Sequence, residues 1–161
     1  MIPTSESAIR TSFVNCTRGE TKRLALPNDL ATRPWDDLDF LGWRDPSAPQ
    51  RAYLVAESDT RLVGVALRVA QQSGRVRRSM CSLCLTAHSG DGVALMTARK
   101  AGPEGRQGNS VGVYLCADLA CSLYLRGKRT GGWRIQETLT LPEKIDRTKT
   151  ALTAFLHRVA E

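Results

Sequence analysis

With 161 residues, 42% of them apolar, the chain is long enough for one ordinary domain with its own core and too short for two. Its net charge of +7 comes from residues 71–134, where ten basic side chains accompany three acidic ones, and this excess suggests an anionic partner. No apolar run approaches the roughly 20 residues that span a bilayer, and "MIPTSESAIR" does not resemble a secretion signal. We therefore expect a cytoplasmic, monomeric protein that does not bind membranes.

Two short helices are expected at the start of the chain. Ser5 is suited to cap the first helix, which is expected to run to about Val14. The second helix is expected between Thr17 and Ala25, and Pro27 ends it.

Residues 34–68 are expected to contain an irregular segment and then a pair of strands. The stretch "PWDDLDFLGWRDPSAP", residues 34–49, combines prolines, acids and two tryptophans, which indicates an ordered irregular segment whose aromatic rings pack on the core. The stretch "AYLVAESDTRLVGVALR", residues 52–68, has two Val- and Leu-rich runs around Ser58, Asp59 and Thr60, which predicts a β-hairpin.

Further strands are expected in the second half of the chain. A polar loop at residues 71–79 leads to the first cysteine pair. "GVALMTAR" at residues 92–99 and "SVGVYLC" at residues 110–116 have strand composition. The stretch between them, residues 100–109, contains three glycines and a proline, which predicts a long exposed connection.

Two more helices are expected after these strands. Asp118 is suited to cap a helix that runs to Arg126 and stops at a glycine. Thr140 and Glu143 have the spacing of a capping box for a C-terminal helix over residues 141–159. Its apolar side chains recur at helical spacing: Leu141, Ile145, Leu152, Phe155, Leu156 and Val159.

Four of the five cysteines form two close pairs, "CSLC" and "CADLAC". Disulfides rarely persist in a reducing compartment, so this spacing favours a metal site. The first pair falls in a turn and the second joins a strand end to a helix, which is a treble-clef arrangement over about residues 79–127. We predict one structural Zn²⁺ held by Cys81, Cys84, Cys116 and Cys121. The expected fold class is α+β, with small antiparallel sheets, a treble-clef zinc finger and flanking helices.

Two alternatives exist for the cysteine pairs. They can be small buried hydrophobic residues, although two pairs at ligand spacing that bracket a strand pair are hard to obtain from packing alone. They can also hold a catalytic zinc, although four thiolates leave no open position for water or substrate. His88 lies close enough in sequence to replace one thiolate, but "TAHSGDG" reads as an exposed turn, so a solvated side chain is expected.

The remaining reactive residues do not form a catalytic set. His157 is expected to face solvent and Cys16 to lie in the core. The acids at residues 36–39 lack a histidine or metal partner and are expected to serve as caps and surface charge. The glycine-rich stretch at residues 102–112 lacks the lysine of a phosphate-binding loop. We therefore predict a protein that is not an enzyme.

Several separate motifs resemble one known family in the expected order. These are "SFVNCTRGETKRLALP", "LDFLGWRDP", "RAYLVAE", "RSMCSLCLTAHSG", "VALMTARKAG" and "GNSVGVYLCADLACSLYLRGK", over about residues 9–130. They resemble the elongation factor G-binding proteins, the FusB or FBP family, and specifically their C-terminal treble-clef zinc-finger domain. The resemblance implies a single FBP-like domain over residues 1–161.

The resemblance also implies a function. Members of this family bind elongation factor G, help it leave a ribosome stalled by fusidic acid, and hold one zinc, here through the four cysteines of the two pairs. Tyr114 and nearby basic residues fall where the partner-binding face is expected: Arg99, Lys100, Arg106 and Lys128. Resistance proteins of the family carry a helical domain before the zinc domain, and only a few residues precede the matching region here.

Two functions are therefore open at this point. The first is a zinc-dependent binding module for elongation factor G, with a translation or fusidic acid resistance role. The second is a basic zinc finger that contacts ribosomal RNA, for which residues 71–134 supply charge but few stacking aromatic rings, namely Tyr114, Tyr124 and Trp133. A solvated basic face is the alternative to a nucleic-acid interface.

Overall fold

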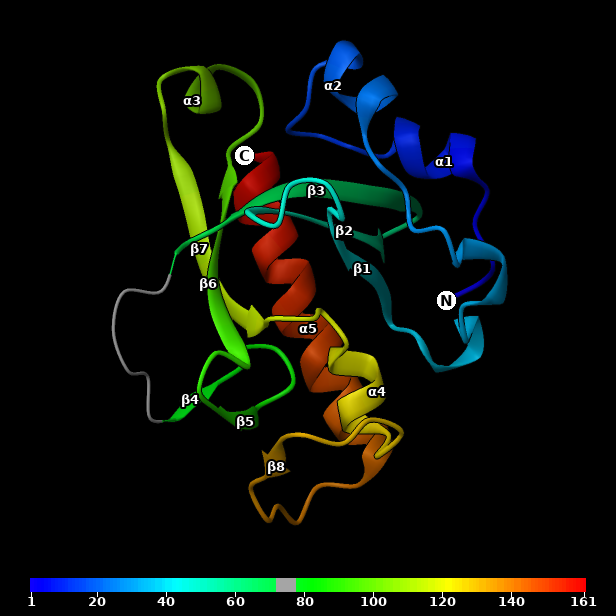
Figure 1. The fold of residues 1–161 in the computed structure, drawn as a ribbon, viewed down its shortest axis with the longest axis vertical. Helices are drawn as coiled ribbons and strands as arrows, with labels where there is room; N and C mark the ends of the chain where they lie inside the picture. Colours follow the sequence, from blue (N-terminus) through cyan, green and yellow to red (C-terminus); the bar gives the residue numbers. More distant parts are fainter. Residues whose placement is uncertain (72–77) are drawn as a thin grey trace.

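The computed structural model describes residues 1–71 and 78–161 and contains two antiparallel sheets (Figure 1). The larger sheet has the strand order β1-β2-β3-β6-β7, with neighbouring strands antiparallel throughout. Its strands are β1 (Phe40–Arg44), β2 (Arg51–Ser58), β3 (Arg61–Val69), β6 (Val93–Arg99) and β7 (Ser110–Cys116). The smaller sheet has the order β4-β5-β8, with β4 (Arg78–Met80), β5 (Thr86–Ser89) and β8 (Trp133–Arg134).

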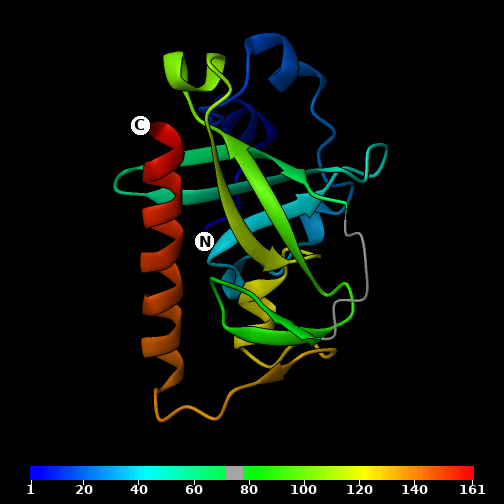
Figure 2. The same ribbon diagram turned by 90° about the vertical axis from the view of Figure 1, so that its left-hand side faces the viewer.

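The C-terminal helix α5 (Leu141–Ala160) covers one side of the larger sheet (Figure 2). Along each strand, successive side chains point alternately to the α5 side of the sheet and to the opposite side, as the pleat of a β-strand requires. The resulting core joins the sheet, the cysteines and α5, whose buried contributions are Leu152, Phe155, Leu156 and Val159. One continuous cluster therefore connects the helix to the cysteine region.

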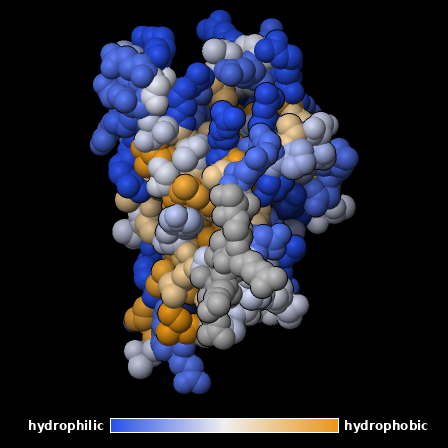
Figure 3. All heavy atoms as spheres, turned by 60° about the vertical axis from the view of Figure 1, so that its left-hand side comes forward, coloured by the Kyte–Doolittle hydropathy of each residue, from blue (hydrophilic) through white to orange (hydrophobic). Residues whose placement is uncertain are grey.

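The N-terminal segment covers the opposite side of the sheet, but only at the β1–β2–β3 end. It consists of α1 (Glu6–Thr11), α2 (Arg18–Arg23) and two 3-10 turns, η1 (Leu30–Thr32) and η2 (Trp35–Asp37). Its apolar side chains pack with those of β1 and β2 in a second cluster: Ile9, Phe13, Leu24, Trp35, Leu38, Leu41, Trp43, Tyr53 and Val55. The outer side of β6 and β7 is left uncovered by this layer (Figures 1 and 2). A space-filling view with the left-hand side of Figure 1 brought forward shows hydrophobic residues exposed in the middle and lower part of the molecule, below a hydrophilic upper part (Figure 3).

Several expected elements are confirmed. Ser5 caps α1, and the hairpin β2–β3 turns at Asp59, whose φ is 56°. The capping box between Thr140 and Glu143 is present at the start of α5. The two tryptophans of residues 34–49 are buried, and His157 is exposed on α5.

Three expectations about secondary structure are wrong. Residues 34–49 are not irregular throughout, because β1 lies within them; it is buried on both sides, so it lacks the alternation that marks a half-exposed strand. The connection between β6 and β7 contains a short helix, α3 (Gly102–Arg106). The sequence does not predict this helix because two glycines and a proline lie within it. The helix after Cys116 begins later than expected: α4 (Cys121–Leu125) has Ala120 as N-cap.

Two further points concern the described parts of the chain. The polar loop expected at residues 71–79 falls largely on residues 72–77, which lie outside the described residues. Among the helices that the structure describes, none combines the length and the apolar character that a membrane crossing requires.

Candidate metal centre

The first cysteine pair lies in the tight turn between β4 and β5. The amide of Cys81 donates to Thr86 O at 3.0 Å, and the amide of Leu85 donates to Cys81 O at 3.0 Å. Leu85 has a positive φ of 54°, which turns the chain back sharply after Cys84. Both cysteine side chains are buried, so this turn points two sulfur atoms into the protein.

The second pair joins the end of β7 to the start of α4. Cys116 is the last residue of the strand and Cys121 the first of the helix. The amide of Leu119 donates to Cys116 O at 2.8 Å, and Leu119 also has a positive φ, 58°. Asp118 does not act as the N-cap, but its Oδ1 accepts a hydrogen bond from the Ala120 amide at 3.1 Å and so holds this second turn.

The four sulfur atoms lie within 4.8 Å of one another. Cys81 Sγ is 3.6 Å from Cys121 Sγ, and Cys84 Sγ is 3.5 Å from Cys116 Sγ. These separations exceed the roughly 2.05 Å of a disulfide and approach the edge of about 3.8 Å that a tetrahedron of sulfurs has at 2.3 Å from zinc. The site therefore fits one zinc ion with four thiolate ligands, as the sequence predicts.

The electrostatics of the cluster favour a bound cation. A hydrogen bond from Cys116 lowers the pKa of Cys81, whereas hydrogen bonding with Cys116 and complete burial raise the pKa of Cys121 well above its usual value. Four buried thiols at this distance cannot all ionise unless a positive charge compensates them. A divalent ion supplies that charge, and it would leave the four-thiolate site with a formal charge of about −2.

His88 lies against the cluster, and the expectation that it is solvated is wrong. Its side chain is only 4% exposed, and its Nε2 is 3.4 Å from Cys116 Sγ. The ring packs edge-on against Tyr124, with centroids 4.8 Å apart. A Cβ on Gly92 would lie 2.5 Å from His88 Cβ, and one on Gly132 would lie 2.9 Å from His88 Cε1. Both glycines therefore make room for the imidazole.

The structure indicates what His88 does beside the sulfur. A thiolate can only accept hydrogen bonds, so Nε2 must carry a proton to interact favourably with Cys116. The neighbouring Thr86 hydroxyl is placed similarly, 3.2 Å from Cys84 Sγ. The sequence offers one weak signal for the positions of Thr86 and His88. Both residues follow the first cysteine turn directly and lie in β5, the strand by which the chain leaves that turn.

Replacement of His88 by alanine is expected to weaken zinc retention roughly tenfold or more, because the hydrogen-bond donor that orients a ligand sulfur is lost. Competition with a chromogenic chelator measures the change. His88→Gln keeps an N–H donor and is expected to retain most of the affinity. Equal zinc affinity in His88→Ala and the parent protein would show that the contact has no role in metal binding.

The proposed partner-binding residues occupy different places. Tyr114 is 53% exposed on β7, so it does not face the core. Arg99 lies on β6 on the same side of the sheet, and Arg106 is exposed on α3. Lys100 is half-buried after β6, and Lys128 donates to both carboxylate oxygens of Asp37 at 2.7 Å, which ties it to the N-terminal segment. Of these five residues, only Tyr114 and Arg99 thus share the uncovered outer side of β6 and β7.

Fold and site together define a treble-clef zinc-finger protein of mixed α and β structure. The model of the family "FBP C-terminal treble-clef zinc-finger" matches residues 8–159, so the chain belongs to that family.

The comparison with solved structures gives a consistent result. The structure of the fusidic acid resistance protein FusC superposes with a TM-score of 0.56 and 16% sequence identity, over 99% of this chain and 59% of that one. This chain therefore spans about three fifths of the length of the FusC chain. No curated protein matches the sequence.

Proposed function

We propose that the protein is a non-enzymatic binding module for elongation factor G, with one structural zinc held by Cys81, Cys84, Cys116 and Cys121. The observation that carries this proposal is the family match over residues 8–159. The fold shared with FusC, a fusidic acid resistance protein, supports it. The binding would act in the cytoplasm and would serve release of the factor from the ribosome.

The zinc ligands and the acidic side chains of residues 36–39 support a role in binding and not in catalysis. A site of four thiolates leaves zinc no position for water or substrate. Two of the three acidic residues of the "DDLD" stretch are engaged in ion pairs: Asp39 accepts two hydrogen bonds from Arg126, and Asp37 accepts two from Lys128. These carboxylates are therefore not free for acid–base chemistry.

Tyr114 is coupled to the zinc site through the backbone. The amide of Ser82, inside the first cysteine turn, donates to Tyr114 O at 2.8 Å. Loss of the metal would release this turn and the segment of β7 that carries the tyrosine. Zinc would thus act as a scaffold that keeps an exposed aromatic side chain in place, and aromatic anchors of this kind dominate many protein interfaces.

Replacement of Tyr114 by alanine is expected to weaken binding of elongation factor G by about 2 kcal/mol, the cost typical of losing an interface anchor. Isothermal titration calorimetry with the purified factor measures it. Tyr114→Phe separates the ring from the hydroxyl group, and Ile2→Ala removes an exposed apolar side chain at the N-terminus as a control. Absence of heat at tens of micromolar with the parent protein would reject the partner, whereas unchanged affinity in Tyr114→Ala would reject only the anchor.

A further inference from the structure

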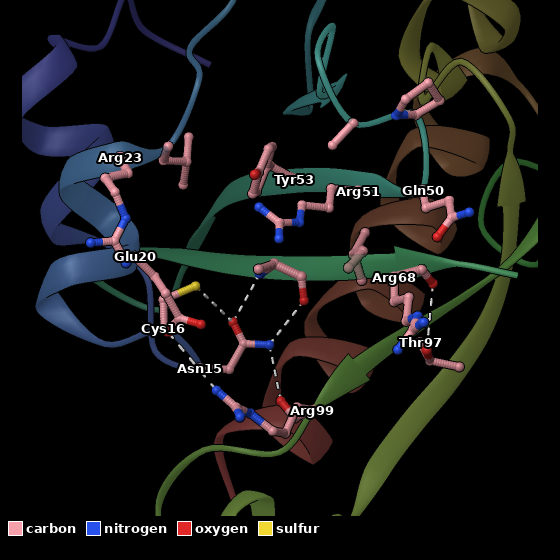
Figure 4. Close-up of a pocket in the computed structure, with 15 residues that line it drawn as sticks. Asn15, Cys16, Glu20, Arg23, Gln50, Arg51, Tyr53, Arg68, Thr97 and Arg99 are labelled. Atoms are coloured by element: carbon pink, nitrogen blue, oxygen red, sulfur yellow. Dashed lines mark hydrogen bonds and ion pairs between the residues drawn. The ribbon is translucent and has the colours of Figure 1, made fainter.

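A basic groove lies beside α2, on the side of the larger sheet that carries the N-terminal segment (Figure 4). It has a volume of about 830 Å³. Its floor is formed by β2, β3 and β6, with α2 on one side and the turn at residues 48–50 on the other. Four arginines line it: Arg23, Arg51, Arg68 and Arg99.

The arginines are arranged unfavourably for the protein alone. Arg51 on β2 is the direct cross-strand partner of Arg68 on β3, and Arg68 is in turn the partner of Thr97 on β6. Like charges directly opposite each other in an antiparallel pair destabilise a sheet. An anion bound beside the two arginines would offset this repulsion.

The groove contains little negative charge of its own. Glu20 is the one acidic residue among its lining side chains, and it already accepts the Thr17 amide, which lowers its pKa and keeps it ionised. Its carboxylate is 4.0 Å from Arg99. Within residues 1–71 and 78–161, no carboxylate forms an ion pair with Arg23, Arg51 or Arg68. The groove therefore presents uncompensated positive charge.

The groove continues into a neighbouring hollow. A second hollow of about 550 Å³ shares Gln50, Arg68 and Thr97 with the first and extends it to Gln71. Tyr53 is 6% exposed, and its hydroxyl group donates to Asp45 at 3.0 Å, so the groove offers no aromatic face on which a base could stack.

We propose that this groove binds the phosphate backbone of single-stranded RNA, without base specificity. Arg51 and Arg68 contact adjacent phosphates, and Arg23 and Arg99 lie on the flank of the strand beside α2. Arginine is suited to this task because its planar guanidinium donates two parallel hydrogen bonds to phosphate oxygens. The RNA interface therefore lies on the face of the larger sheet and not at the cysteine region, where the sequence has its excess of basic residues.

Fluorescence anisotropy with a labelled oligouridine of about 12 nucleotides tests the proposal, because single-strand sites span up to about 16. For single strands the logarithm of the binding constant falls by about 0.7 per phosphate contact for each decade of salt. Arg51→Gln with Arg68→Gln is therefore expected to reduce this slope by about 1.4 and to weaken binding at low salt. The control, Arg61→Gln with Arg158→Gln, removes the same charge outside the groove and is expected to keep the slope.

A second variant removes negative charge from the groove and is expected to strengthen RNA binding. Glu20→Gln removes the groove's own carboxylate while glutamine can still cap α2, and it is expected to bind RNA several-fold more tightly. Equal losses in the groove variant and the control would overturn the proposal, because net charge alone would then explain binding. Tripolyphosphate binding without RNA binding would assign the groove to small anions instead. Loss of elongation factor G binding alone in the groove variant would assign the groove to the protein partner.

Discussion

Replacement of Cys84 by serine is expected to abolish tight zinc binding and to unfold the cysteine region, residues 79–127. Structural zinc contributes on the order of 10 kcal/mol in isolated fingers, more than the entire stability of many small domains. The effect should spread, because the four cysteines belong to the same core cluster as α5 and the larger sheet. Metal analysis together with hydrogen exchange measures both consequences.

Cys16 provides the matched control for this experiment. It is half-buried beside the arginine-lined groove, and burial raises its pKa to about 11, so it is a poor thiolate at neutral pH. Cys16→Ser is expected to leave the zinc content at one ion per chain. Cys84→Ser that still holds a full equivalent of zinc would contradict the four-thiolate site.

Replacement of Phe155 by alanine is expected to lower the free energy of unfolding by about 4 kcal/mol, since a fully buried phenylalanine leaves a cavity that close-packed neighbours cannot fill. Phe155 is 1% exposed and lies in the cluster that joins α5 to the sheet and the cysteines. Urea denaturation followed by circular dichroism, with zinc held in excess, measures the loss.

Lys149→Ala is the control on the same helix. Lys149 is exposed, and a surface substitution of this kind usually changes stability by less than about 0.5 kcal/mol. A loss below about 1 kcal/mol in Phe155→Ala would mean that the sheet and the metal site hold together without α5, contrary to the continuous core.

The largest expected effects thus arise where distant parts of the chain meet, and one ion pair illustrates this. Arg126 and Asp39 are 87 residues apart, yet the guanidinium donates to both carboxylate oxygens at 2.7 and 2.9 Å, and the pair is largely buried. It fastens the segment before β1 to the end of α4. Nothing in the local sequence of either residue identifies the other as its partner.

The sequence by itself determined the features that depend on neighbours a few residues apart. The cysteine spacing predicts the metal site, the capping box of Thr140 and Glu143 predicts the start of the last helix, and the Val- and Leu-rich runs predict the hairpin of residues 52–68. Each of these rests on a turn, a helical period or a strand period, which are set by local backbone geometry. The family motifs lie within the same short stretches.

Only the tertiary structure decided the features that depend on strand register and on close approach. The burial of His88 requires that glycines at positions 92 and 132 come against its ring, and the groove requires that Arg51 lie opposite Arg68. A shift of one residue in the pairing of β2 with β3 would send these arginines to opposite sides of the sheet. The choice between the core and the surface for a polar side chain was therefore made by the packing of the whole chain.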